Sequence, residues 1–204
     1  MSQLKHPLGS FYGGVKLRHW KKLALGDSLD HAGVPQTLVL PLHQYHNSLA
    51  TPIVKVGQTV AKYELLAEAQ ASLSSRLHAP SSGRIVAIED RPIVHRSNLA
   101  APCIVIATDG EDSARATSQL EDWQSTDPAE LTERILGAGI VGLGGAVFPT
   151  AIKVDAARQL SNQLLLINGA ECEPYIACDE SLMRHRTLSV LVGSQIIALS
   201  LIHI

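Results

Sequence analysis

The stretch Gly137–Lys153 reads GAGIVGLGGAVFPTAIK and decides how the second half of this 204-residue chain is organised. Five glycines fall within its first nine residues, and such density is useful only where φ is positive or another group approaches the backbone closely. Pro149 follows Phe148 and can open a helix, because proline fits the first helical turn. A glycine loop that leads into a helix N-terminus is an anion cradle, so the stretch predicts a phosphate site.

Neither of the two common phosphate-loop fingerprints fits this stretch. A P-loop requires a lysine directly after its last glycine, and none is present. A dinucleotide fingerprint read from Gly142 places Val147 where glycine or alanine is required, and it follows a helical pattern where a strand is expected. A tight helix-to-helix turn stays open as the alternative to a phosphate site.

Helices are predicted on both sides of the glycine loop. Before the loop, Asp127 is the expected N-cap, Glu130 completes a capping box and Gly137 is the C′ residue. After the loop, a second helix from about Pro149 to Ala157 presents Lys153 near the glycines. The loop is therefore expected to connect two helices.

One buried strand and one long helix are predicted after these elements. Residues 163–167 (QLLLI) have the continuous apolar character of a strand buried on both faces. The polar segment NGAECEPY follows at 168–175, where a ligand of an open α/β sheet would bind. A helix from about Asp179 runs to the end. Because one strand and three helices do not complete an α/β domain, we expect a truncated polypeptide whose last few residues need not be native.

The first half of the chain is predicted to be a compact β domain. Its strand-like runs are TLVL, IVKV, LLA, RIVAI and IVI at residues 37–40, 53–56, 65–67, 84–88 and 104–106. Turn signals at 57–58 and 81–83 separate them, as is typical of a sandwich or barrel. The expected boundaries are an arm at 1–36, this β domain at 37–110, a polar linker at 111–126 and the second domain at 127–204.

Composition limits the class of protein. The chain has 17 basic and 19 acidic residues and a formal net charge of −2, which argues against wholesale nucleic-acid binding. The N-terminus lacks a signal-peptide core, and no apolar run reaches the roughly 18 to 20 residues that span a bilayer, so we expect a cytoplasmic protein. The basic run at 19–22 is interpreted as solvated surface, with an acidic partner or a membrane as the alternative.

No metal site is expected in this chain. Cys103, Cys172 and Cys178 form no C-x-x-C pair, whereas zinc and iron–sulfur clusters need clustered thiolates. His43 and His46 have no neighbouring cysteine or carboxylate and are interpreted as loop histidines.

The β domain resembles the biotinyl/lipoyl type of barrel-sandwich hybrid over residues 37–108, through the segments 53–60, 65–69 and 78–85. Carriers of that family hold their cofactor on a lysine at a hairpin tip. Residues 70–76 read QASLSSR here and contain no lysine. Because an arginine stays protonated and is not acylated in this way, the resemblance implies a structural or docking role.

The second half resembles the flavin and NADH site of the respiratory complex I 51 kDa subunit superfamily. The residues that carry this resemblance are Gly142–Thr150, Lys153 and the segment NGAECEP at 168–174. Together with the preceding barrel, the segment ECEPYI at 171–176 is similar to the C subunit of the Rnf (Rsx) ion-translocating electron-transport complex. The match covers nearly the whole chain.

The resemblance implies a set of FMN and NADH contacts but no catalytic side chain. These contacts are Gly142, Gly144, Gly145, Ala146, Phe148, Lys153, Asn168, Glu171 and Glu173. Two residues depart from the pattern. Leu143 replaces the arginine of complex I, which favours the Rnf branch, and Val147 stands where glycine is common, which narrows the loop.

The resemblance further implies a fold of mixed α+β or α/β class, with an all-β barrel-sandwich hybrid followed by a partial α/β FMN/NADH-binding domain. The intact protein would take a hydride from NADH onto FMN and pass single electrons to [4Fe–4S] clusters bound by C-terminal cysteines that this chain lacks. The implied setting is the inner face of the bacterial membrane, with other complex subunits and, as a further option, ferredoxin as partners. We expect the fragment alone to be inactive.

Two alternatives remain from the sequence. A soluble NADH dehydrogenase or hydrogenase flavoprotein of the same superfamily would lack two downstream ferredoxin-type cysteine runs. A non-catalytic docking module would act through the lysine-free barrel and bind no flavin.

Overall fold

The computed structural model describes residues 18–26, 28–45, 48–70, 73–94, 99–143, 146–160 and 164–201. The chain divides into two compact units. The barrel unit comprises His31–Leu166 and Val192–Ile204, and the α3 unit comprises Met1–Asp30 and Ile167–Leu191. The two units are described separately below.

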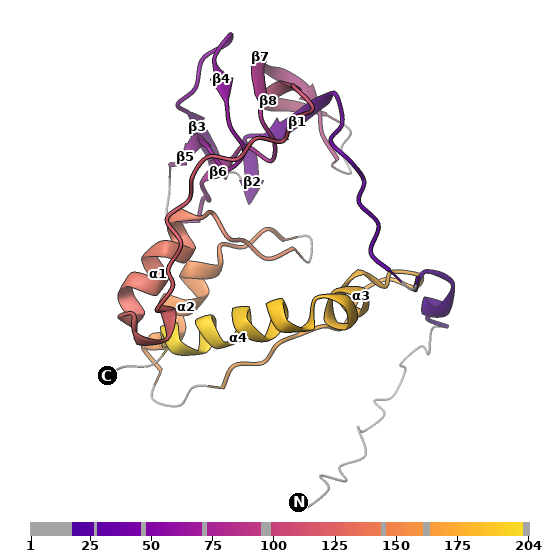
Figure 1. The fold of residues 1–204 in the computed structure, drawn as a ribbon, viewed down its shortest axis with the longest axis vertical. Helices are drawn as coiled ribbons and strands as arrows, with labels where there is room; N and C mark the ends of the chain where they lie inside the picture. The colour runs from indigo at the N-terminus through magenta and orange to yellow at the C-terminus, as the bar shows by residue number, and fades with distance from the viewer. Residues whose placement is uncertain are drawn as a thin grey trace, which may run out of the picture. The chain divides into compact units, whose positions relative to one another are not determined.

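The described elements are labelled in Figure 1. The strands are β1 (Thr37–Pro41), β2 (His43–Tyr45), β3 (Ser48–Pro52), β4 (Thr59–Val60), β5 (Leu65–Ala69), β6 (Leu77–His78), β7 (Gly83–Pro92) and β8 (Ala100–Thr108). The helices are the short 3₁₀ turns η1 (Lys21–Leu23) and η2 (Trp123–Ser125), followed by α1 (Pro128–Gly137), α2 (Thr150–Arg158), α3 (Cys178–His185) and α4 (Thr187–Leu201).

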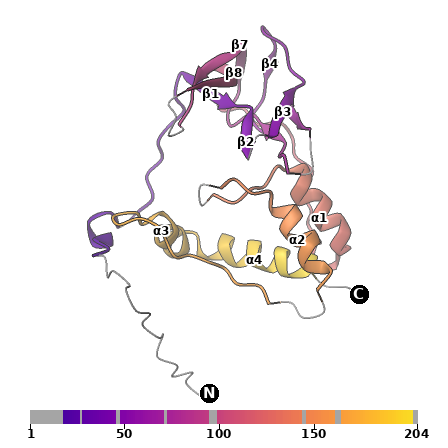
Figure 2. The same ribbon diagram turned by 180° about the vertical axis from the view of Figure 1, so that it is seen from behind.

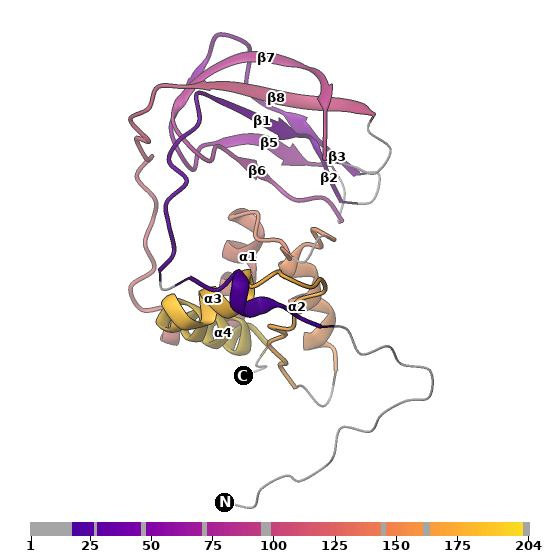
Figure 3. The ribbon, with the colours of Figure 1, turned by 90° about the vertical axis from the view of Figure 1, so that its right-hand side faces the viewer.

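The strands of the barrel unit form two four-stranded sheets, which Figure 3 shows as two layers. One sheet has the order β1-β8-β7-β4 and the other β2-β3-β5-β6, with antiparallel neighbours throughout. The longest pair runs from Gly83 opposite Thr108 to Pro92 opposite Ala100, with a bulge between Ile85 and Ala87. This architecture confirms the barrel-sandwich prediction.

The core of the barrel is one cluster of buried apolar side chains drawn from both sheets. Leu66, Ile85, Ile104 and Ile106 are each 0% exposed. Val86 beside Ile85 is exposed, which is the alternation expected of a strand with one face inward. Each fully buried aliphatic side chain of this kind contributes roughly 1.5–3 kcal/mol to folding.

The predicted strand at 53–56 is wrong, because this segment crosses from one sheet to the other. The N–H of Ile53 donates to the carbonyl of Leu66 in β5, at 2.9 Å. The N–H of Gly57 donates to Ile85 in β7 of the second sheet, at 2.7 Å. Because its two ends are hydrogen-bonded to different sheets, the segment does not form a strand of either sheet.

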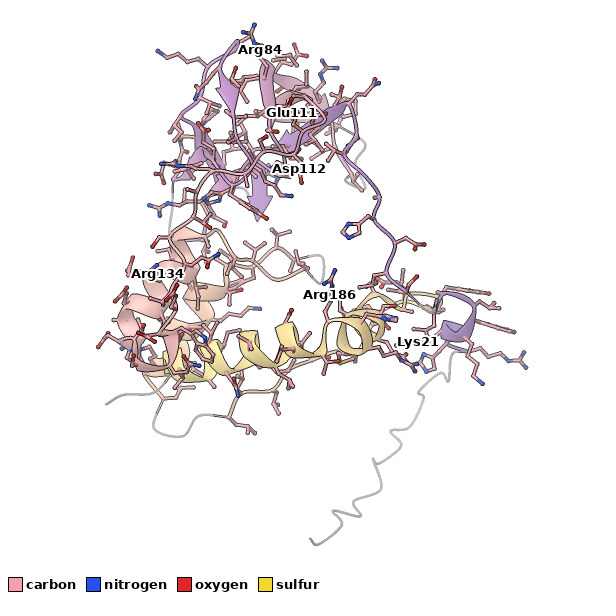
Figure 4. The ribbon with its side chains drawn as sticks, in the orientation of Figure 1. Lys21, Arg84, Glu111, Asp112, Arg134 and Arg186 are labelled. Carbon is pink, nitrogen blue, oxygen red and sulfur yellow. The ribbon has the colours of Figure 1, made fainter. Side chains whose placement is uncertain are left out.

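Two further differences concern segments expected to be loops. His43 lies in β2 and is not a loop histidine, whereas His46 lies outside the described residues. The start of the expected linker pairs with the barrel, since Lys62 donates its backbone N–H to Ser113 and accepts from that of Arg115. Asp112 adds an ion pair with Lys62, and Figure 4 labels this aspartate beside the strands.

Helix α1 begins as the sequence predicts and ends two residues later than expected. The Asp127 side chain accepts from the N–H of Ala129 at 2.8 Å, which is the expected N-cap. Glu130 forms no capping box and instead accepts from Arg134 one turn further on. The C′ residue is Gly139, not Gly137, because Gly139 has the left-handed φ of 67°.

The bonds at this helix end form a Schellman motif. The N–H of Gly139 donates to Leu136 at 3.1 Å and that of Ile140 donates to Ile135 at 3.3 Å. Helices α1 and α2 pack side by side in the barrel unit, as Figures 1 and 2 both show. The glycine loop therefore leaves a fixed helix end and enters a second helix.

The strand predicted at 163–167 is absent from the described residues of this segment. Residue 163 lies outside the described residues, and 164–167 have no strand pairing. Leu164 is 81% and Leu166 76% exposed, so these side chains are not buried on two faces. A strand buried on both faces needs a neighbour on each side, and the described part of the chain places all its strands between Thr37 and Thr108.

The single helix predicted from Asp179 is two helices. Arg186 between them has φ −129° and ψ 31°, outside the helical region. The Thr187 hydroxyl donates to the carbonyls of Met183 and Arg184, so a side chain takes over bonds that would continue the helix. Helix α4 carries no charged residue along Thr187–Leu201. Within the described residues, no helix combines the length and apolar character needed to cross a membrane.

Candidate functional site

The neck of the glycine loop is closed by a short antiparallel bridge between Val141 and Pro149. The N–H of Gly142 donates to the carbonyl of Phe148 at 2.9 Å, and that of Thr150 donates to Ile140 at 3.0 Å. The loop tip, which includes the predicted contacts Gly144 and Gly145, lies outside the described residues. The neck thus holds the start of α2 in a defined position relative to the loop.

Three predicted site residues converge on this neck. The ammonium of Lys153 lies over the Phe148 ring, 5.4 Å from its centroid, in a cation–π contact. A Cβ added to Gly142 would stand 3.7 Å from the Lys153 Nζ atom and 3.8 Å from the Phe148 carbonyl oxygen. Ala146, also predicted, is exposed just before this point. Glycine at 142 leaves the space beside the ammonium open.

Val147 adopts the conformation that glycine takes most easily. Its φ is 54°, in the left-handed region, where a β-branched side chain is a genuine outlier. Such a residue costs on the order of 1–3 kcal/mol and persists where the surrounding bonds over-determine it. The bridge and hydrogen bonds of the neck supply that constraint. Backbone strain is therefore stored within the glycine loop.

The neck has the chemistry that a phosphate group requires. The N-terminus of α2 begins at Thr150, where backbone N–H groups and the helix dipole favour an anion. Lys153 adds a full positive charge on the same side of the loop neck. The open position at Gly142 gives a phosphate close access to the backbone. The described residues therefore fit the phosphate end of a flavin mononucleotide.

The other predicted contacts, Asn168, Glu171 and Glu173, belong to the α3 unit, whereas the glycine loop belongs to the barrel unit. The side-chain oxygen of Asn168 accepts from the N–H of Ala170 at 2.9 Å, which fixes a local turn. Asn168 and Glu173 are both exposed. Their outward polar groups are available to a ligand.

Glu171 differs from these two because its carboxylate is already bound. Its side chain is only 2% exposed and forms an ion pair with Lys21, which Figure 4 labels. The second oxygen accepts from the N–H of Asp179 in the first turn of α3, at 2.8 Å. The hydrogen bond from Lys21, followed by that backbone bond, lowers the pKa of Glu171, and the same pair raises the pKa of Lys21. Glu171 is therefore an ionised, enclosed group.

Sequence reasoning missed the partners of this carboxylate. Lys21 stands in the basic run that is interpreted above as solvated surface, yet its side chain is only 26% exposed. Trp20 stacks on Tyr175 with ring centroids 6.3 Å apart and an interplanar angle of 7°. The one available signal was the basic run itself, for which an acidic partner is the alternative to solvated surface.

Metal ligation finds no support in the described residues. They contain no group of three or more histidine, cysteine or carboxylate side chains placed to hold a metal ion. Cys103, Cys172 and Cys178 are all free thiols. Burial raises the pKa of Cys103, which keeps that thiol protonated.

A groove of about 950 Å³ lies in the barrel unit beside Gly137 and Ile140, at the start of the glycine stretch. Its lining includes Tyr63, Trp123, Leu131 and Ile135, and it contains none of the predicted contact residues.

Comparison with known proteins agrees with both halves of the chain. Residues 9–111 match the RnfC barrel sandwich hybrid domain, and residues 135–202 match the Nuo51 FMN-binding domain. The predicted fold class, with a barrel-sandwich hybrid followed by an FMN-binding domain, is thereby confirmed.

Similar proteins share one description, the C subunit of an ion-translocating oxidoreductase complex. The Pseudomonas aeruginosa protein is 43% identical over 93% of this chain and 24% of its own length. The Rhodobacter capsulatus protein is 38% identical over 98% of this chain and 39% of its length, and one from Haemophilus influenzae is 37% identical over 93% and 29%. The chain thus spans less than two fifths of each of these relatives. By its barrel domain and its FMN-binding domain, the chain belongs to the RnfC family.

Proposed function

We propose that this chain supplies the flavin and nicotinamide site of the RnfC subunit in an ion-translocating electron-transport complex. The glycine loop and Lys153 would hold the phosphate of FMN. Asn168 and Glu173 would meet the polar parts of the flavin and of NADH. Bound FMN would supply the chemistry that accepts a hydride from NADH and releases its two electrons one at a time.

One observation carries the phosphate part of this proposal. The Lys153 ammonium, the open backbone at Gly142 and the N-terminus of α2 gather at a single neck, closed by the Gly142–Phe148 hydrogen bond. A dianionic phosphate gains from the lysine charge and from the dipole and backbone N–H groups at the start of α2, and glycine at position 142 leaves room for it. An anion-binding role also accounts for the position of the flexible lysine side chain over Phe148, beside the loop.

The test is a titration of FMN into the chain, followed by quenching of flavin fluorescence. Lys153→Gln removes the charge and is expected to weaken binding by roughly tenfold, or about 1.4 kcal/mol. Gly142→Ala is expected to weaken it similarly, because the new methyl fills the space beside the ammonium. The substituted chain should still fold, since the contacts at 3.7 and 3.8 Å are ordinary van der Waals distances.

Lys55→Gln is the matched control for the lost charge. Lys55 is exposed and lies in the crossover between the two barrel sheets, away from the glycine loop. Its substitution should leave FMN affinity unchanged. Equal affinities in wild type, Lys153→Gln and Gly142→Ala would refute the phosphate cradle.

The remaining steps are part of the same proposal. The single electrons would pass to [4Fe–4S] clusters in the part of the RnfC subunit beyond this chain, with other subunits or ferredoxin as partners. Ion translocation requires a membrane, and NADH is a cytoplasmic reductant, so we propose a peripheral position on the cytoplasmic face. Without those clusters, the chain alone would not turn over NADH with an external electron acceptor.

A soluble NADH dehydrogenase of the same superfamily is the alternative to be distinguished. Sequencing the gene beyond the codon for Ile204 decides between them. Two ferredoxin-type runs of the pattern C-x₂-C-x₂-C-x₃-C-P support the Rnf assignment, and their absence favours the soluble enzyme.

A further inference from the structure

Within the α3 unit, residues 18–23 are bound to the turn at 171–179 by three contacts of different kinds. Lys21 forms an ion pair with Glu171 across 150 positions of sequence. Trp20 stacks on Tyr175, with the rings nearly parallel. The N–H of Tyr175 donates to the His19 carbonyl at 2.8 Å. An ionic, an aromatic and a backbone contact thus fix the same two segments.

The contacts of Glu171 leave its carboxylate no access to a ligand. One oxygen is bound to Lys21 and the other caps α3 through the N–H of Asp179. With 2% of the side chain exposed, a nucleotide would have to break both bonds to reach it. Asn168, just before this turn, and Glu173, within it, are both exposed. Glu171 therefore joins the turn to residues 18–23, while the polar groups beside it face solvent.

Backbone strain marks the two residues of the aromatic contact. Trp20 has φ 52° and Tyr175 has φ 69°, both in the left-handed region. Non-glycine residues hold such angles only where the surrounding contacts over-determine them, and they cluster at functional sites. Here two such residues contact one another, which indicates that residues 18–23 are held firmly against the turn.

We propose that Lys21 is a positioning residue for the nucleotide site: by holding Glu171, it fixes the turn that presents Asn168 and Glu173 to the ligand. This inference rests on the proposed function. Lys21 acts through Glu171 and touches no substrate. It gives residues 18–23 a role in nucleotide binding, although they precede the whole barrel in sequence.

The first test measures the contact itself, without ligand. The chain has two tryptophans, Trp20 and Trp123, so a Trp123→Phe background leaves Trp20 as the only one. Lys21→Met should shift the Trp20 emission to the red as its ring leaves Tyr175. Lys22→Met, on the same 3₁₀ turn, is the matched control and should leave the emission unchanged.

The second test measures FMN and NADH affinity in the same variants. Lys21→Met and Glu171→Gln should each weaken binding about tenfold, and the double variant should lose no more, because both remove one interaction. Lys21→Arg should restore most of the affinity. Arginine keeps the positive charge but has a different shape, so Lys21→Arg would not restore the affinity if Lys21→Met had weakened it through a general packing defect.

A third readout is the pH at which the Trp20 emission changes. Lys21 holds the pKa of Glu171 below its ordinary value of 4.5, with Asp179 and Glu180 also facing the lysine and Cys178 beside the glutamate. The contact should therefore survive acidification past 4.5 and fail only as pH falls through the lowered pKa. In Lys21→Met, where the contact is already lost, the Trp20 emission should show no such change with pH.

The outcomes separate the two proposals. Wild-type binding of FMN or NADH that Lys21→Met leaves unchanged overturns the positioning role alone. A wild-type chain that binds neither ligand overturns the proposed function and, with it, the positioning role. Weakened binding in Lys22→Met equal to that in Lys21→Met also overturns the inference, since general loss of charge would then explain both.

Discussion

Replacing Gly139 by alanine tests how α1 and the glycine loop are attached to the barrel. A Cβ at this position would lie less than 3.0 Å from the carbonyl oxygen of Arg76 in the barrel, at a φ of 67°. The left-handed conformation costs an alanine about 1–2 kcal/mol, and backbone movement to relieve the clash costs about 1–3 kcal/mol. Alanine also reduces the conformational entropy of the unfolded chain, which stabilises the folded state by about 0.4–1 kcal/mol and offsets part of this cost. We expect the free energy of unfolding to fall by about 1–5 kcal/mol, which exceeds the loss in the control by the cost of the clash.

Gly110→Ala is the control, because Gly110 has φ 79° and nothing within 4 Å of the added Cβ. It bears the conformational cost alone, about 1 kcal/mol or less after the unfolded-state gain. The assay is urea unfolding followed by Trp123 fluorescence in a Trp20→Phe background. With a slope of about 2 kcal/mol per molar urea, Gly139→Ala should lower the midpoint by about 1 M more than the control. Equal midpoints for the two variants would refute the close approach.

Three further predictions concern the barrel unit. Gly83→Ala should destabilise it by about 3 kcal/mol or more, because the added Cβ would lie less than 3.0 Å from the Ala107 backbone. Thermal unfolding measures this loss, and an unchanged melting temperature would contradict the close packing of β7 on β8. Burial, and then the charge of Arg76, lowers the pKa of His78 from 6.5, so the unfolded state binds more protons and the free energy of unfolding should fall as pH drops below 6.5. His78→Asn should flatten that decline in urea titrations at several pH values, and an identical slope would rule out this histidine. Val147→Gly should remove about 1–2 kcal/mol of strain from the left-handed backbone, while the more flexible unfolded chain costs about 0.5–1 kcal/mol. The melting temperature should therefore rise or stay the same, and FMN should bind more tightly. A clear fall in both the melting temperature and the FMN affinity would count against strain at this residue.

Local sequence signals were sufficient for much of the barrel. The runs at 84–88 and 104–106 are rich in β-branched residues, and both lie within long strands of the structure. The run at 53–56 has the same composition but crosses between sheets. Composition reports that a segment is extended and half-buried, but which sheet it joins depends on distant partners.

In the candidate site too, contacts between residues close in sequence could be predicted, whereas contacts between distant segments could not. The spacing of the second helix predicted Lys153 near the glycines, and in the structure its ammonium lies over the Phe148 ring and near Gly142. The Lys21–Glu171 pair spans 150 positions and leaves no periodic trace in either segment. The resemblance indicated that Glu171 was important. Only the structure showed that its carboxylate is enclosed.

The contact between Gly139 and Arg76 has a mechanical consequence. In carrier domains of this barrel type, the hairpin tip must swing between distant active sites. Here Arg76, at that tip, is bonded to Glu68 at 2.9 Å, and its backbone touches the residue from which the glycine loop departs. The tip is therefore a fixed support, and a force applied to the barrel would be passed through this contact to the start of the glycine loop.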